Sequence, residues 1–365
     1  MRSNYRKIGD FIRPVKVKNR ELKYSELLGI NIDKFFMPSV ANVVGTDMTN
    51  YKIVEPGQFA CNRMHVGRDY RIPVALSREK DPFIVSPAYD VFEITRPSEL
   101  DTDFLMMWFS RKEYDRNAWF FTDADVRGGL SWDAFCSIGI PIPSIEKQHE
   151  IVAEYQAVQK RIQLNEQLIQ KLEETAQAVY RRWFVEGVDM ENLPDGWKIG
   201  LLEELVEFKN GKTNPKKSGN YPVYGGNGII DFVNEYNSVD VIPIGRVGAY
   251  CGSLYREPGK CWISDNAISA KSKVKCNMFA YYLLKDLKLN ERSEGTGQPL
   301  ITQGLLNSIE VLIPRTELID EFENNVSKLY SFENLLVKKN QKLTELKELL
   351  LSKLATIENQ PINFP

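Results

Sequence analysis

The sequence predicts an α+β fold: two globular mixed α/β modules, separated by two long helices that pack antiparallel as a coiled coil. An apolar run that ends in proline, Ser137–Pro143, recurs at Ser308–Pro314. A long charged segment with a heptad pattern follows each copy, and the same offset aligns Gln170 with Gln341. Each copy is much longer than the roughly 20–50 residues of a solenoid repeat. The chain therefore contains a duplicated module rather than an array.

Length and composition are those of an ordinary globular protein. The 365 residues are enough for about two domains, and 43% of them are hydrophobic and 26% charged. No apolar run approaches the roughly 18 residues that a membrane helix needs, and the first residues do not resemble a signal peptide. The five cysteines are scattered without a CxxC pair, which argues against a zinc site or a disulfide framework. We expect a cytoplasmic protein that does not contact a membrane.

The charge balance argues against a simple nucleic-acid-binding protein. The chain has 47 basic and 49 acidic residues and a net charge of −2, whereas proteins that bind duplexes usually carry a basic surplus. A nucleic-acid ligand would require that positive charge be segregated on one face, or that partner subunits supply much of the phosphate contact.

The first module is expected over residues 1–143. It contains short strand-like runs between Pro, Gly and Asp turns, at 51–54, 72–76, 83–85 and 89–94. A short amphipathic helix is expected at 103–109, opened by an Asp or Thr cap.

A first long helix is expected within residues 144–185, with its regular part at about 145–184. Core-sized residues alternate in steps of four and three, which is a heptad seam. The members of this seam are Ile151, Tyr155, Val158, Ile162, Asn165, Ile169, Leu172, Ala176, Val179 and Trp183. Asn165 is the one polar member. At 1.5 Å per residue the helix would be roughly 60 Å long.

The second module is expected over residues 186–315, after a polar linker. Its opening, Trp197–Gly200, echoes Tyr5–Asp10, and glycine-rich, β-leaning sequence follows. The segment Tyr224–Gly228 lacks the GxGxxG spacing of a dinucleotide site, so a turn is expected there. The second long helix is expected over 316–356, and residues 357–365 are expected to form a tail. The heptad seam of this second long helix contains Phe322, Val326, Leu329, Leu336, Asn340, Leu343, Leu350 and Leu354.

Two heptad helices of similar length in one chain can pack on each other. The second module must return the chain to its starting level, which favours an antiparallel pair. The alternative is that each helix packs separately on its own module.

The motifs of several enzyme classes are absent. The sequence has no Asn/Asp-Pro-Pro-aromatic or Phe-x-Gly-x-Gly motif of adenine methyltransferases, and no P-loop. His65 and His149 are the only histidines. His149 is expected to be a solvated residue at a helix start, and no Ser or Cys partner is suggested for His65 in its loop. We therefore predict no catalytic and no metal-binding residue in this chain.

Two loops hold the residue types that recognise nucleic acids. In the first module the candidates are Asn62, Arg63, His65, Arg68, Tyr70 and Arg71. Arginine can donate two hydrogen bonds to guanine, and asparagine can pair with adenine in the same way. The alternative is a surface loop with scattered salt bridges.

In the second module a lysine-rich loop is suited to phosphate contact, although a solvated turn explains it equally well. Its candidates are Lys209, Lys212, Asn214, Lys216 and Lys217. Arg246, Tyr250 and Asn266 lie near expected strand ends and are further candidates.

Several segments, which together extend over nearly the whole chain, resemble one protein family. The resemblance is carried by Ile140–Val152, Tyr180–Phe184, Leu193–Trp197, and Gly245–Gly252 with Ser264–Ile268. They are similar to the specificity subunits of type I restriction-modification enzymes.

The resemblance implies a subunit that is not itself catalytic. Each module would be a target-recognition domain for one half of a split, asymmetric DNA sequence, and the helices would be the spacer. Two adenine-N6 methyltransferase subunits would dock on the chain, and restriction subunits with translocase and nuclease activity would join them. S-adenosylmethionine, ATP and Mg²⁺ would belong to those partners, with no cofactor in this chain. The partners' positive surface would also account for the near-zero net charge.

Two other functions are compatible with the residues. One is a stand-alone DNA-modifying enzyme with a divergent site, which would show turnover as a purified chain. The other is a coiled-coil scaffold that joins proteins and does not contact DNA.

Overall fold

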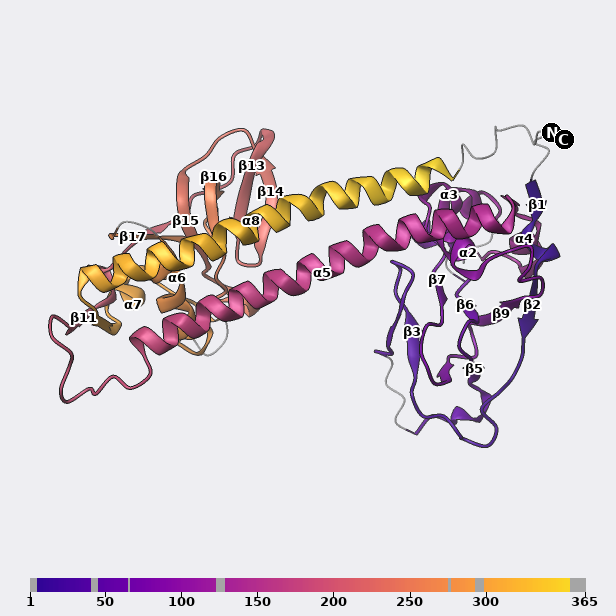
Figure 1. Cartoon of the computed structure of the whole chain (residues 1–365), viewed down its shortest axis with the longest axis horizontal. Coiled ribbons are helices and arrows are strands. Elements are labelled where there is room, and N and C mark those ends of the chain that lie inside the picture. Colours follow the sequence, from indigo (N-terminus) through magenta and orange to yellow (C-terminus); the bar gives the residue numbers. More distant parts are fainter. Residues whose placement is uncertain are drawn as a thin grey trace. The chain divides into compact units, whose positions relative to one another are not determined.

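The computed structural model describes residues 5–40, 45–64, 66–122, 129–274, 277–292 and 299–354. The chain forms two compact units: Met1–Leu164 with Lys339–Pro365, and Asn165–Lys338. We call them unit 1 and unit 2. Each contains one module and parts of the long helices α5 (Ile145–Phe184) and α8 (Thr316–Lys353) (Figure 1). His65 and the tail at 357–365 lie outside the described residues.

The first module is built on a small antiparallel sheet with the strand order β2-β9-β6-β7, accompanied by the pairs β3-β4 and β5-β8. Its strands are β1 (Tyr5–Lys7), β2 (Ile12–Val15), β3 (Leu28–Ile30), β4 (Phe36–Pro38), β5 (Lys52–Val54), β6 (Phe59–Cys61), β7 (Val74–Leu76), β8 (Phe83–Val85), β9 (Asp90–Ile94) and β10 (Gly139–Pro141). Its helices are α1 (Val66–Asp69), α2 (Thr102–Phe109), α3 (Lys112–Phe120) and α4 (Trp132–Ser137). The four predicted strand runs are confirmed as β5, β7, β8 and β9. Helix α2 is capped as predicted, because the Asp101 side chain accepts a hydrogen bond from the Phe104 amide at 2.9 Å.

The second module contains a six-stranded sheet with the order β12-β17-β15-β16-β13-β14, in which only β13 and β16 run parallel. Its strands are β11 (Lys198–Leu201), β12 (Val206–Asn210), β13 (Ser218–Gly225), β14 (Gly228–Val233), β15 (Ser238–Gly245), β16 (Glu257–Ile263), β17 (Ala267–Ser272) and β18 (Glu310–Ile313), and its helices are α6 (Asn277–Asp286) and α7 (Gln303–Asn307). Short 3-10 turns lie at Ile8–Asp10, Met48–Asn50, Leu202–Glu204, Gly248–Tyr250 and Leu289–Arg292. The predicted turn is confirmed between β13 and β14, where Gly228 has φ +78°.

Each module is closed by pairing between its first and last strands. β1 pairs antiparallel with β10, with Tyr5 opposite Pro141. β11 pairs antiparallel with β18, with Lys198 opposite Ile313. Each of the two segments that repeat in the sequence therefore supplies the closing strand of its own module, β10 in the first and β18 in the second. A long helix starts soon after each closing strand.

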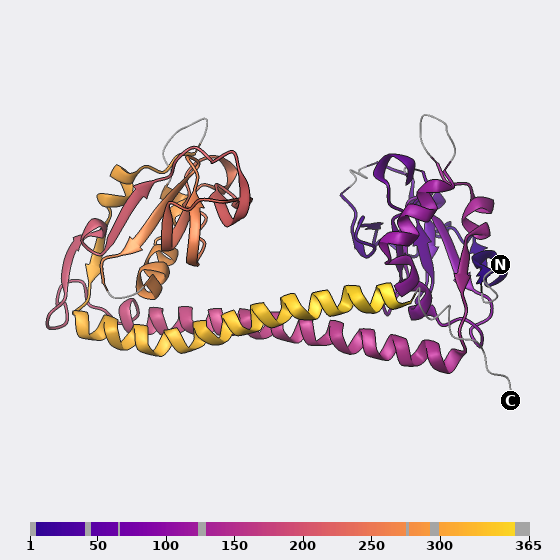
Figure 2. The ribbon, with the colours of Figure 1, turned by 90° about the horizontal axis from the view of Figure 1, so that it is seen from above.

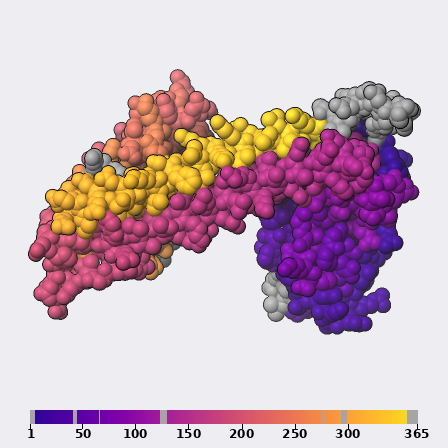
Figure 3. All heavy atoms as spheres, in the orientation of Figure 1, coloured from indigo at the N-terminus to yellow at the C-terminus, as the bar shows by residue number. Residues whose placement is uncertain are grey.

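The long helices pack antiparallel in both units. In unit 1 the Lys347 ammonium lies 6.0 Å from the Tyr155 ring centroid. The next contact lies one heptad later in α5 and one heptad earlier in α8. There the side-chain amide nitrogen of Asn340 donates to the backbone carbonyl of Ile162 at 3.4 Å. In unit 2 the rings of Tyr180 and Phe322 are 6.0 Å apart. The predicted antiparallel pair is confirmed, and the alternative of two separately packed helices is wrong; Figures 2 and 3 show α5 and α8 side by side in each unit.

Both modules also pack directly on the helices. In unit 2, Tyr180 of α5 and Phe322 of α8 belong to the same buried cluster as Phe279 of α6. In unit 1, Val152 of α5 and Leu354 join the aromatic core of the first module. The hydrophobic stripe of each helix therefore serves both its partner helix and a module.

Candidate nucleic-acid interface

Backbone hydrogen bonds of the second module bring three chain segments together at one edge of its sheet. We call Gly211–Asn214, Arg246–Tyr250 and Ser264–Asn266 the loop edge. The amide of Lys212 donates to the Ile263 carbonyl at 2.9 Å, and the amide of Arg246 donates to the Asn266 carbonyl at 3.0 Å. The candidates Lys212, Arg246 and Asn266 therefore share one edge, although they are far apart in sequence.

Glycine makes this close approach of backbones possible. A β carbon at Gly211 would lie 1.9 Å from the Ser264 carbonyl oxygen, and one at Gly245 would lie 2.5 Å from the Gly226 carbonyl oxygen. Real β carbons essentially never approach that closely, so larger residues would separate the strands. Glycine at 211 and 245 is thus explained by the close packing of backbones at the loop edge.

Most of the candidate side chains at the loop edge face solvent. Lys212, Tyr250 and Asn266 are exposed there. Lys216 and Lys217 are exposed as well, but they lie just before β13, where the Lys217 carbonyl accepts from the Asn234 amide at 3.2 Å. Together these side chains offer cations, an amide and a phenol to a ligand, which is the chemistry of contacts to phosphates and bases.

The remaining candidates of the second module differ from these. Lys209 lies on β12 and its ammonium is 3.0 Å from Glu207. The Arg246 Nε and Asn214 Oδ1 atoms are buried and have no hydrogen-bond partner among the described residues. A buried polar atom without a partner costs about 1–3 kcal/mol, so a polar ligand that reached either atom would regain that free energy.

In the first module, two of the candidates hold their own loop in place. Arg63 donates from Nε to Asp90 on β9 at 2.8 Å and from Nη1 to the Leu130 carbonyl, and it lies 5.6 Å from the Trp132 ring centroid. Its side chain is 18% exposed. Asn62 accepts a hydrogen bond from the Met64 amide at 3.1 Å, which forms a local turn.

The other described candidates of this loop lie at the surface. Arg68 pairs with Asp69 at 2.7 Å, and Arg71 pairs with Asp33 at 3.2 Å. Both arginine side chains are about half exposed or more, at 67% and 48%. Surface ion pairs of this kind contribute about 0–1 kcal/mol, so either arginine can exchange its carboxylate for another acceptor.

An aromatic cluster beside these arginines was not predicted from the sequence. The ring of Tyr70, which is 63% exposed, lies 5.3 Å from that of Trp119 at the end of α3. Phe120 and Phe121 follow, and Phe120 is 79% exposed. The sequence feature that could have predicted this cluster is the run of three aromatic residues, Trp119, Phe120 and Phe121, after a charged segment. In an amphipathic helix such as α3, large aromatic residues usually face the core, so exposure of these rings was not expected.

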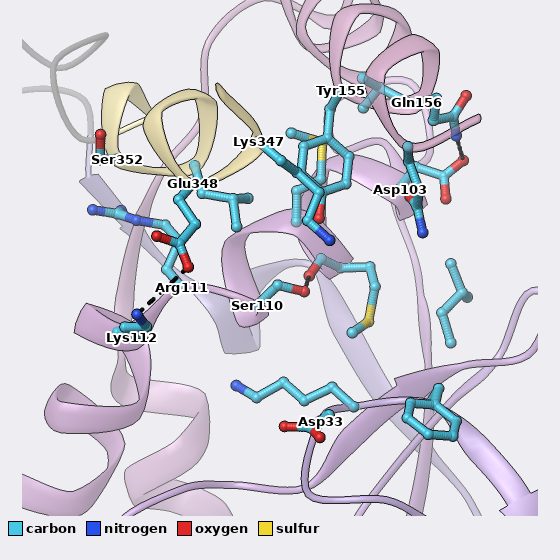
Figure 4. A pocket seen from close by; sticks show the side chains of 18 of the residues that line it. Asp33, Asp103, Ser110, Arg111, Lys112, Tyr155, Gln156, Lys347, Glu348 and Ser352 are labelled. Atoms are coloured by element: carbon cyan, nitrogen blue, oxygen red, sulfur yellow. Dashed lines mark hydrogen bonds and ion pairs between the residues drawn. The ribbon is translucent and has the colours of Figure 1, made fainter. Parts of the chain in front are cut away.

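A cavity of about 1050 Å³ lies in unit 1 between the first module and the two helices. It contains side chains of both charge signs (Figure 4). Lys112 and Glu348 face each other across it at 3.7 Å, and Gln156 donates to Asp103 at 3.0 Å. In its wall, burial lowers the pKa of Lys34, an effect that the paired Asp115 carboxylate opposes. Several of these charges are paired within the lining, and the contacts given for it do not join a nucleophile to a base.

The described residues offer no other reactive centre. Burial raises the pKa of the Cys61 and Cys261 thiols, so these sulfurs are poor nucleophiles. No group of His, Cys, Asp or Glu among the described residues is placed to hold a metal ion. In the part of the chain that the structure describes, no helix is long and apolar enough to cross a membrane.

Duplicated modules on an antiparallel helix pair, with exposed cations, amides and aromatics on their loops, define a two-site binding protein. A family model, the type I restriction modification DNA specificity domain, matches residues 72–174 and 194–348. The chain belongs to this family. The two matches fall on the two halves of the duplication. Membership confirms the prediction of a specificity subunit, which is not itself an enzyme.

Individual relatives agree with this assignment. The chain is 22% identical to the HindI specificity subunit of Haemophilus influenzae over an alignment of 456 residues, which covers 95% of this chain and 97% of that protein. It is 29% identical to the EcoprrI specificity subunit of Escherichia coli over 112 residues, and this match spans only 28% of each chain.

Two solved structures share the fold. The type I S subunit from M. genitalium has a TM-score of 0.58 and 20% identity, and the alignment covers 96% of this chain and 95% of that one. A chain from a study of complex assembly and conformational transition in a type I R-M system has a TM-score of 0.51 and 16% identity, with 96% of both chains covered.

Proposed function

We propose that the chain recognises a bipartite, asymmetric DNA sequence, with one half-site for each module. The first module, 1–143, and the second, 186–315, would act as target-recognition domains, and the helices at 144–185 and 316–356 would act as the spacer. The observation that carries the proposal is the duplication itself. Two modules with the same closing strands carry different exposed loops, which suits two different half-sites read by one chain.

The contacting residues follow from exposure and charge. In the first module we assign base or phosphate contact to Arg68, Tyr70 and Arg71, with Asn62 and His65 as further candidates, while Arg63 supports the loop. In the second module the lysines at 209, 212, 216 and 217 would contact phosphates. Arg246, Tyr250, Asn214 and Asn266 would lie near the bases.

Partner subunits would supply the chemistry. We propose that two adenine-N6 methyltransferase subunits dock on the chain and that restriction subunits join the assembly in the cytoplasm. S-adenosylmethionine would bind to the former, and ATP with Mg²⁺ to the latter. The likeness to a chain solved in a study of type I R-M complex assembly supports a multi-subunit state. A net charge of −2 is compatible with this arrangement, because partners can supply part of the positive surface around the duplex.

Co-purification of the tagged chain from its native host, followed by methylome sequencing, tests this function. We expect methyltransferase subunits in the complex, and N6-methyladenine in a two-part motif of constant gap that disappears when the chain is deleted. Turnover of DNA by the purified chain with Mg²⁺ and S-adenosylmethionine would favour the stand-alone enzyme instead. A complex that forms but never shifts DNA would favour the scaffold.

A further inference from the structure

The second module is attached to the helix pair at two separate levels. The first level is apolar: Tyr180 of α5 and Phe322 of α8 pack around Phe279 of α6, with ring centroids 5.9 Å and 6.4 Å from the Phe279 ring. Apolar contacts of this kind are strong but not directional. They fix the position of the module on the helices better than its angle.

The second level is a buried ionic cluster around Arg256, whose side chain is 16% exposed. Its Nη2 lies 3.1 Å from Glu173 on α5 and 2.6 Å from Glu333 on α8. The guanidinium lies between two aromatic rings, 4.8 Å from the Tyr281 centroid and 4.6 Å from the Tyr330 centroid. One residue of the module thus bridges both helices.

Helix α6 reinforces the same cluster. Tyr282 donates to Glu173 at 3.1 Å, and the Lys285 ammonium lies 2.6 Å from the other oxygen of that carboxylate. Glu173 precedes Tyr180 by two turns of α5, so the two levels of attachment are about 10 Å apart. Two attachments at that separation define an angle, which one attachment cannot do.

The ionic cluster contributes more to orientation than to stability. A buried ion pair is about as stable as, or less stable than, well-packed apolar residues in its place. Burial raises the pKa of Glu333, which means that its charged form is disfavoured there, and the Arg256 guanidinium opposes this shift. A planar guanidinium held between two rings and two carboxylates has a narrow choice of orientation.

Arg256 is also mechanically connected to the loop edge. It immediately precedes β16, Glu257–Ile263, and the far end of that strand continues into Ser264–Asn266. Seven residues of strand span roughly 23 Å. A small rotation at Arg256 would therefore be converted into a larger displacement of the loop edge.

Among its described residues, unit 1 has no corresponding cluster. The repeat-equivalent positions of Glu173 and Glu333 are Thr344 and Ile162, which carry no charge. At that level unit 1 has the cavity of about 1050 Å³, crossed by the exposed pair Lys112–Glu348. The duplication therefore does not require this device, which belongs to the second module.

We propose that Arg256 is a positioning residue that fixes the angle of the second module on the helix pair. It would thereby set which gap between half-sites the complex accepts. This inference rests on the proposed function. It adds that gap selectivity depends on a side-chain cluster as well as on helix length.

The test uses the full complex with its methyltransferase subunits, and duplexes that share both half-sites but have gaps one or two base pairs shorter or longer. The double variant Arg256→Met with Glu333→Leu replaces the ion pair with apolar residues, and Glu173 keeps Lys285 and Tyr282. We expect methylation at the preferred gap to persist, while discrimination against neighbouring gaps falls about tenfold, equivalent to about 1.4 kcal/mol. Both half-site sequences should stay the same.

The matched control is Lys171→Met with Glu174→Leu, which removes an exposed ion pair from α5 and should leave gap discrimination unchanged. Undiminished discrimination in the Arg256 variant would overturn the inference, as would a change in the bases of the second half-site. If the double variant does not fold, Glu333→Gln replaces it, with the same expected direction and the same overturning result. If the wild-type complex itself shows no bipartite methylation, the proposed function is refuted instead.

Discussion

At the scale of single residues, arginines of one short loop have different roles. Arg63 is held by Asp90 and the Leu130 carbonyl inside the first module. Arg68 and Arg71 are paired with the carboxylates of Asp69 and Asp33 at the surface. The difference arises from strands and loops that are distant in sequence, so it becomes visible only in the fold.

Replacement of Arg68 or Arg71 by alanine should therefore affect recognition without affecting the fold. If either side chain makes a paired contact with guanine, its loss costs roughly 1–3 kcal/mol of specific binding and relaxes one base pair of one half-site. Binding of the complex to single-base variants of the site measures this effect. Arg63→Ala is the contrasting variant and should instead lower the melting temperature. An unchanged affinity and base preference for both surface variants would remove this loop from the interface.

Exposed lysines of the second module should act differently from arginines. Lys212→Ala or Lys216→Ala should weaken binding to specific and unrelated DNA alike, and should reduce the slope of log affinity against log salt by about 1, because one phosphate contact is lost. Titrations at several salt concentrations measure both quantities. Lys171→Ala, which changes an exposed lysine on α5 outside the loop edge, is the control. A loss confined to the specific sequence would contradict phosphate contact.

Residue types were predictable from the sequence, but their surroundings were not. The sequence identified Lys212, Arg246 and Asn266 as candidates and could not show that backbone hydrogen bonds place them at one edge. The exposed ring of Trp119 was not predicted either. Burial and non-local pairing determine these properties, and neither is encoded in a local pattern.

At the scale of secondary structure elements, the first turn of α5 is locked to the first module by Gln148. This residue is fully buried. Its amide nitrogen donates to the Glu99 and Pro143 carbonyls at 2.8 Å and 2.9 Å, and its oxygen accepts from the Asp101 amide at 2.8 Å. A single side chain thus joins the start of α5, the closing segment before it and the cap of α2.

Gln148→Leu should destabilise this junction by about 2–4 kcal/mol, because it leaves up to three partly buried backbone groups without this partner, at up to roughly 1–3 kcal/mol each before relaxation. Hydrogen exchange of the α2 and early α5 amides measures the effect, which should be absent from the helices of unit 2. Gln156→Leu, which loses one exposed hydrogen bond, is the control. Equal exchange in the two variants would show that Gln148 does not hold the junction.

Elements with a strong local period were predictable, and elements defined by partners were not. The heptad seams predicted both long helices, and the return of the chain through the second module predicted their antiparallel order. The six-stranded sheet was not foreseen, because its parallel pair β13–β16 joins segments with other strands between them. The role of Gln148 was not predicted either. The residue at the equivalent position of the repeat is the apolar Ile319, so the duplication did not indicate a shared polar contact there.

At the scale of the whole molecule, we expect the helix pair to set the gap between half-sites. Both long helices contribute residues to both units: α5 is part of the chain that leads from the first module to the second, and α8 leads back from the second module into unit 1. The target bases and the gap itself were not predictable, because contact depends on groove geometry and on DNA shape as well as on residue identity.

The most direct measurement is the methylome of a variant with four residues inserted into both helices, after Leu164 in α5 and before Lys339 in α8. Both insertion sites lie next to the contact between Ile162 and Asn340. Glu173, Arg256 and Glu333 all belong to unit 2, so the insertions do not separate them. Four helical residues add about 6 Å, and base pairs are about 3.4 Å apart. An insertion of the same length in the linker at Asp189 is the control. We expect the same half-sites with a gap one to two base pairs wider for the helix variant only; an unchanged gap, or altered half-sites at the old gap, would contradict the role of the helices as the spacer.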